Sequence, residues 1–166
     1  MIRITLVVAL FVCNLSLAQP HTSAKTLRSI EPDSCLLSVY QVATKEMVRS
    51  EDQITEKLLE RKKITNNDLK ELLNKASKKS SYQSERALLT HYNIRVDLYR
   101  DGSMYGNLIL SSITGNISIN GQTEDQRSYG NVSQKLGTYM IQFLEDNDML
   151  KQIDSIDLQG FTKNFD

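Results

Sequence analysis

The chain has no tryptophan, two prolines, seven glycines and two cysteines among its 166 residues. So little proline and glycine argues against a collagen-like or proline-rich polymer, and no repeat period typical of a solenoid is visible. The charged fraction of 24% and the hydrophobic fraction of 40% are those of a folded domain, which excludes a disordered chain. The sequence therefore predicts one globular domain.

Groups that bind metals or catalyse reactions are also scarce. The only histidines are His21 and His91, whereas a zinc site needs several His or Cys ligands at suitable spacing. Gly-x-Ser-x-Gly turns, glycine-rich phosphate loops and His-Glu-x-x-His motifs are absent from the sequence. A calcium loop starting at Asp146 would need glycine and glutamate where Lys151 and Asp157 stand. We therefore expect neither a cofactor nor a metal site.

The N-terminal segment has the pattern of a secretory signal. Arg3 precedes an apolar run from Ile4 to Val12, and small residues follow at Ser16 and Ala18. The run is too short for a membrane anchor, which takes about 20 apolar residues. We predict that residues 1–18 are a signal peptide and that the mature protein is secreted or periplasmic, with no membrane span after cleavage.

The charge balance bears on the kind of partner. Cleavage removes Arg3 and no acid, so the mature chain has a net charge of −1, unlike the strongly basic domains that bind nucleic acid. Residues 45–79 hold 10 basic and 7 acidic side chains, whereas residues 145–166 hold 6 acidic and 2 basic ones. Such asymmetry can steer a charged partner or hold two parts of the domain together. We expect no nucleic-acid partner.

The first half of the mature chain predicts helices. Residues 19–33 hold both prolines and few large apolar side chains, which indicates a flexible leader. From Ser34 to Met47 apolar residues recur at three and four positions, which predicts a helix, and a second helix is expected after Ser50. A third is predicted over residues 65–76, where Thr65 supplies an N-cap signal.

The period then changes from 3.6 to 2 over residues 88–99, which predicts a strand with one apolar face. Asp101-Gly102 follows at once, and both residues tolerate the positive φ of a two-residue hairpin turn. With these two residues as the turn, Leu98 is expected to face Tyr105 on the returning strand.

The remaining pattern completes a meander and adds a helix. A short strand is predicted over residues 117–119, followed by an exposed polar loop over 121–130. Apolar residues between Val132 and Leu144 form a wide helical face suited to packing on a sheet. Residues 149–158 are compatible with a helix or with an edge strand. The predicted fold class is α+β, with an N-terminal helical unit, a central antiparallel meander and a C-terminal helix in one domain over residues 34–166.

One catalytic arrangement can be drawn from the sequence. Cys35 at a helix start would have a lowered thiol pKa, with His91 as base and Asp97 or Asn107 orienting it. The order of Cys and His is similar to that of exported papain-like cell-wall peptidases, which implies a secreted thiol hydrolase. Residues 32–37 depart from that family because they hold no glycine.

The scarcity of catalytic groups favours a different function. We expect an exported, non-catalytic binding module, of the inhibitor or envelope-assembly kind, whose partner is another protein and which can form a homodimer. The interaction surface is expected at an exposed edge of the meander or in the polar loop. The loop residues concerned are Thr123, Glu124, Asp125, Gln126, Arg127 and Tyr129.

Overall fold

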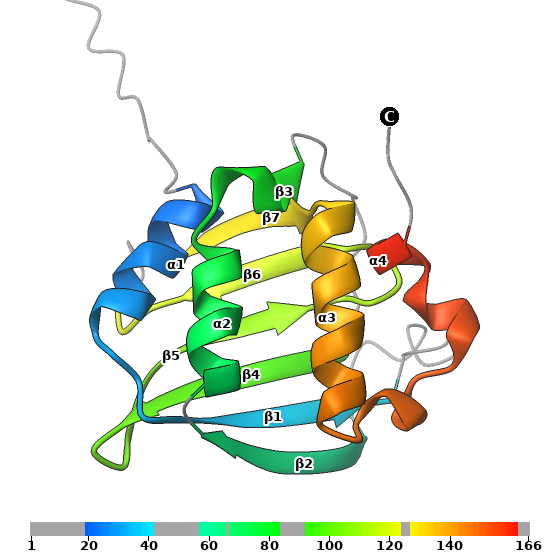
Figure 1. Cartoon of the computed structure of the whole chain (residues 1–166), viewed down its shortest axis with the longest axis horizontal. Helices are drawn as coiled ribbons and strands as arrows, with labels where there is room; N and C mark the ends of the chain where they lie inside the picture. Colours follow the sequence, from blue (N-terminus) through cyan, green and yellow to red (C-terminus); the bar gives the residue numbers. More distant parts are fainter. Residues whose placement is uncertain (1–18, 42–56, 66, 84–91, 124–126, 163–166) are drawn as a thin grey trace, which may run out of the picture.

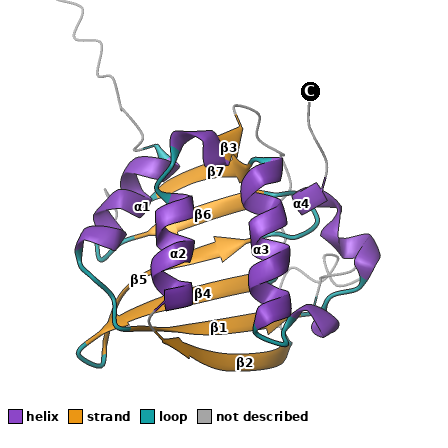
Figure 2. Ribbon diagram, in the orientation of Figure 1, coloured by secondary structure: helices purple, strands orange, loops and turns teal. Residues whose placement is uncertain are grey.

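The structure is a computed structural model that describes residues 19–41, 57–65, 67–83, 92–123 and 127–162. Within these residues, one seven-stranded antiparallel sheet is covered by helices on one face (Figures 1 and 2). The α+β class, the central meander and the C-terminal helix are confirmed.

The order of the strands in the sheet is β2-β1-β4-β5-β6-β7-β3. The helices are α1 (Pro20–Ser29), α2 (Asn67–Ala76), α3 (Gln134–Asp146) and α4 (Gln159–Thr162). The strands are β1 (Ser34–Tyr40), β2 (Leu58–Thr65), β3 (Tyr82–Gln83), β4 (Ile94–Arg100), β5 (Ser103–Leu110), β6 (Asn116–Asn120) and β7 (Ser128–Val132). Short 3-10 turns η2 (Lys79–Ser81), η4 (Leu150–Gln152) and η5 (Ser155–Leu158) complete the chain.

The core lies between the sheet and the helices. Alternate residues of a strand point to opposite faces, and directly paired residues share a face. The apolar pairs of β1 and β4 are Cys35–Leu98, Leu37–Val96 and Val39–Ile94, and all six side chains are fully buried. They form the apolar floor on which the helices pack.

Helices α2 and α3 lie where local signals predict them. In α2, Leu69, Leu72, Leu73 and Ala76 are buried, as their spacing requires. Ser133 caps α3 by accepting a hydrogen bond from the Leu136 amide at 3.4 Å.

Helix α1 replaces the flexible leader expected over residues 19–33. Pro20 stands in its first turn, where a missing N–H costs nothing, and Ala24 and Leu27 are buried in the core. The Tyr105 hydroxyl donates a hydrogen bond to the Leu27 carbonyl at 3.4 Å. The prediction was wrong because only a narrow stripe of this helix is apolar, so its packing does not show in the composition.

The helix predicted from Ser34 is also wrong where the structure describes it, since Ser34–Tyr40 is strand β1. Cys35, Leu37 and Val39 occupy alternate positions, as one face of a strand requires, and Cys35 and Val39 are also four positions apart, as on one face of a helix. Hydrogen bonding to β2 on one side and to β4 on the other favours the strand. The rest of that helix and most of the helix expected after Ser50 lie outside the described residues.

The hairpin at Asp101-Gly102 is confirmed, with φ values of 52° and 77° at the two residues. Its register differs from the prediction because a bulge follows Leu98, which pairs with Gly106 instead of Tyr105. The bulge adds one residue to one strand and so moves every later pair by one position.

The polar loop expected over residues 121–130 is shorter than predicted, because β7 begins at Ser128 and pairs with β6. The segment after α3 is neither one long helix nor an edge strand. It forms η4, η5 and α4, and the buried side chains of Met149 and Phe161 anchor it to the core.

The two oppositely charged segments of the sequence meet at one end of α3. The Lys62 ammonium in β2 donates to the Asn147 carbonyl at 2.9 Å and lies 3.7 Å from the Asp148 carboxylate. The Gln152 amide donates to the Glu60 carboxylate at 2.5 Å. Part of the charge asymmetry therefore joins β2 to the chain after α3.

Candidate functional site

Cys35 does not have the surroundings of a nucleophile. Its side chain is fully buried beneath the helices. Burial raises the pKa of the thiol to about 12, and the carboxylates of Asp97 and Asp68 act in the same direction. A catalytic thiol needs a lowered pKa and access to substrate, so the structure offers no support for this role.

The groups expected to assist Cys35 are not gathered around it. His91 lies outside the described residues. Asp97 pairs with Leu36, so it belongs to the opposite face of the sheet from Cys35, and it binds the Arg95 guanidinium at 2.7 Å. Asn107, opposite Asp97, accepts from the Asn120 amide at 2.8 Å.

Of the predicted residues of the polar loop, the structure describes Thr123, Arg127 and Tyr129, and residues 124–126 lie outside the described residues. Thr123 and Arg127 are exposed, and Arg127 donates to the Asn120 side chain at 3.0 Å. Tyr129 belongs to β7 and is 38% exposed. These described residues lie at the surface, and Tyr129 lines a cavity of about 370 Å³ together with Pro20 and Tyr82.

Both edges of the meander carry a further strand. Strand β1 pairs with β4 along one side, and the two-residue strand β3 pairs with Asn131 and Val132 of β7 on the other. The described sheet ends at β3 on that side and at β2, the lowest strand in Figure 1, on the opposite side. Sequence reasoning missed this edge because which strand lies outermost depends on pairings between distant segments.

Strand β2 has two apolar residues at its start and four charged ones in its middle. Leu58 and Leu59 are 41% and 37% exposed. Arg61 and Lys63 pair with Ser38 and Leu36 of β1 and so lie on the sheet face away from the helices. The Arg61 guanidinium donates to the Ser38 hydroxyl at 3.1 Å, while Lys63 is exposed. The outer edge of β2, with which no other described strand pairs, therefore combines backbone groups with cationic side chains.

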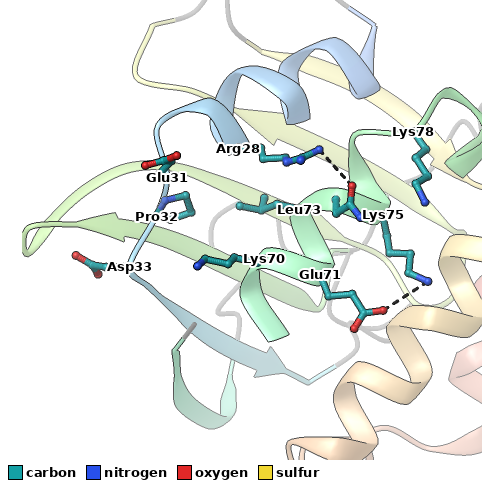
Figure 3. A pocket seen from close by; sticks show the side chains of 10 residues that line it. Arg28, Glu31, Pro32, Asp33, Lys70, Glu71, Leu73, Lys75 and Lys78 are labelled. Carbon is teal, nitrogen blue, oxygen red and sulfur yellow. Dashed lines mark hydrogen bonds and ion pairs between the residues drawn. The ribbon is translucent and has the colours of Figure 1, made fainter. Parts of the chain in front are cut away.

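A second feature is a cavity of about 810 Å³ between α1, the turn that follows it and α2 (Figure 3). Charged side chains dominate its wall, and Arg28, Lys70, Lys75 and Lys78 are the cations among them. Leu73 is the one residue of the apolar core that reaches it.

In the part of the chain that the structure describes, no group of three or more His, Cys, Asp or Glu side chains is placed to hold a metal ion. No helix among the described residues is long and apolar enough to span a membrane. The described residues form an α+β fold, and the two surface features used below are the sheet edge at β2 and the charged cavity.

Comparison with known proteins adds no relative: no family model, no curated protein and no solved structure matches this chain.

Proposed function

We propose that this chain is an exported, non-catalytic binding module that engages another protein at the outer edge of β2, which we call the β2 edge (residues 58–65). The observation that carries the proposal is the position of β2 at the end of the described sheet. An outermost strand presents backbone N–H and C=O groups that an extended segment of a partner can pair with.

The side chains of β2 indicate the chemistry of that segment. Arg61 and Lys63 project from the same face, two residues apart, which matches alternate side chains of an added strand. Carboxylates on the added strand would lie beside these cations, and Leu58 and Leu59 offer apolar contact at one end. Basic residues on an edge strand also oppose pairing with neutral or basic strands. The partner is therefore an acidic extended segment.

A second copy of this chain fits the β2 edge poorly. Antiparallel pairing of two β2 strands about a two-fold axis sets one residue opposite its own copy. At the middle of the strand this residue is Glu60, Arg61, Lys62 or Lys63, so every central register opposes like charges, which is destabilising. The charge pattern favours a different protein over a homodimer through this edge.

Export is part of the proposal because of the predicted signal peptide. Gln19 is the N-cap of α1, and its carbonyl accepts from the Thr22 amide at 2.9 Å. Cleavage after Ala18 would therefore leave every described element in place. Amino-terminal sequencing of the protein recovered from its native cells should begin at Gln19, and retention of Met1 would contradict export by this route.

The experiment uses the mature chain and two synthetic peptides of equal length, one alternating Val with Glu and the other Val with Lys. Binding is followed by NMR chemical shifts and by hydrogen exchange of the β2 amides. The Val-Glu peptide should bind and slow exchange along residues 58–65, whereas the Val-Lys peptide should not. Equal binding of both peptides, or binding without protection of β2, would refute the proposal.

The matched variants separate the β2 edge from overall charge. R61E/K63E should abolish binding of the Val-Glu peptide and introduce binding of the Val-Lys peptide. K25E/K135E makes the same charge change at two exposed lysines, in α1 and α3, and should bind the Val-Glu peptide almost as the parent does. Loss of binding in both variants would show a net-charge effect and would count against a site at β2.

A further inference from the structure

We propose that the cavity between α1 and α2, here called the α1–α2 groove, binds a small polyanion that carries two or more carboxylate or phosphate groups. The groove lies among the helices, and β2 lies at the edge of the sheet, so this inference does not depend on the proposed protein-binding edge (Figure 1).

Three cations of the groove are available to a ligand. The Arg28 guanidinium donates one hydrogen bond, to the Asn74 side chain at 3.2 Å, which leaves its other N–H groups for an anion. The side chains of Lys70 and Lys78 make no hydrogen bond or ion pair with another described residue, and both are exposed on the wall of the groove (Figure 3). A guanidinium and two ammonium groups around one cavity are the donors that bind oxyanions.

Two of the three carboxylates that line the groove bind neighbouring residues. Glu71 lies 3.5 Å from the Lys75 ammonium, one turn along α2. Asp33 accepts from the Ser34 hydroxyl at 2.6 Å and from the Asp101 amide at 2.8 Å. Glu31 is the remaining carboxylate. Asp33 keeps its negative charge, because its hydrogen-bond donors are neutral groups. Outside the Glu71–Lys75 ion pair the groove therefore has three cations and two carboxylates, a net charge of +1.

The surface next to the groove carries further positive charge. Lys25 lies in α1, and Lys79 follows Lys78 directly. The pKa of His21 is lowered by its partial burial and, in addition, by the positive charges of Lys25 and Lys79. Lys25 and Lys79 therefore add positive charge near α1 beyond that of the groove itself.

The size and composition of the groove fit the binding of a small ligand. A volume of about 810 Å³ lies within the range of small-molecule sites, roughly 300–1,000 Å³. The ionisable groups of the groove wall are arginine and lysine cations and the carboxylates of Glu31, Asp33 and Glu71. The cations of this wall point to binding of an anion.

The test is isothermal titration calorimetry of the mature chain with two probes, inorganic tripolyphosphate and citrate, at low and high salt. At least one probe should bind, more weakly at high salt, and the tighter of the two identifies phosphate or carboxylate as the preferred group. Absence of heat with both probes at low salt would overturn the proposal.

Two matched double variants locate the site. K70Q/K78Q should weaken binding by about tenfold or more, because each substitution removes a charged donor. K135Q/K151Q lowers the net charge equally at exposed lysines elsewhere and should retain binding. Equal weakening of binding in both variants would contradict the assignment of the anion site to the α1–α2 groove. Thermal unfolding of each variant checks that it is folded. R61E, which leaves the charge of Lys63 near Asp33 unchanged, should bind the anion as the parent does, so failure at β2 and failure at the groove can be told apart.

Discussion

The replacement Gly137→Ala tests the packing of the chain's last helix against α3. Gly137 lies in the first turn of α3, and α4 crosses it at Phe161. A Cβ atom built on Gly137 would lie 2.2 Å from the Phe161 carbonyl oxygen and 2.7 Å from its Cα. These are backbone atoms, so the clash cannot be relieved by a side-chain rotation and α4 has to move.

Two effects of opposite sign determine how far Gly137→Ala changes the unfolding free energy. Alanine favours a helix over glycine by about 1 kcal/mol, which would stabilise α3. Overpacking of a filled interior costs about 1–3 kcal/mol, and here it displaces Phe161, whose side chain is fully buried. Because a contact of 2.2 Å is far inside van der Waals distance, we expect the clash to exceed the gain in helix propensity. The net loss of unfolding free energy should be about 1–2 kcal/mol.

The assay is urea denaturation of the mature protein, followed by circular dichroism, with the slope of the transition checked for change. Thr138→Ala is the control, since Thr138 is exposed on the same helix and its replacement should alter stability by about 0.5 kcal/mol or less. A Gly137→Ala protein about 1 kcal/mol more stable than the parent would show that propensity alone acts, and would refute the close packing of α3 and α4.

Three further predictions use the same preparation. Leu27→Ala should lower the unfolding free energy by about 2–5 kcal/mol because Leu27 is buried, whereas a side chain in a flexible leader would have almost no effect on the urea midpoint. Cys35 should react with iodoacetamide only after unfolding; rapid labelling of the native protein at neutral pH would contradict its burial. Because the folded state raises the thiol pKa of Cys35 from 9.0 to about 12, the unfolded state loses that proton first as the pH rises. Stability should therefore fall between about pH 9 and pH 12, in urea titrations at stepped pH, and a Cys35→Ala variant should show a smaller fall.

Local signals in the sequence were enough for several elements. The Asp101-Gly102 turn requires positive φ at two adjacent residues, and that preference is contained in the residues themselves. Helices α2 and α3 each have an apolar face long enough to be recognised, although Thr65, the predicted start of α2, is the last residue of β2.

The candidate surfaces could not be predicted in the same way. The β2 edge exists because β1 pairs with both β2 and β4, which joins segments far apart along the chain. The α1–α2 groove exists because Arg28 and Asn74 meet across 46 positions of sequence. Neither arrangement leaves a periodicity or motif in either segment alone.

The sequence by itself therefore determined the α+β class, the hairpin and the two long helices, because each depends on residues within a turn or two of one another. Only the tertiary structure decided that residues 34–40 are a strand and residues 20–29 a packed helix. The physical reason is that both segments have weak local preferences, and the hydrogen bonds and buried area supplied by distant strands outweigh those preferences. The same long-range pairing decides which strand is left at the edge, and with it the surface that a partner can reach.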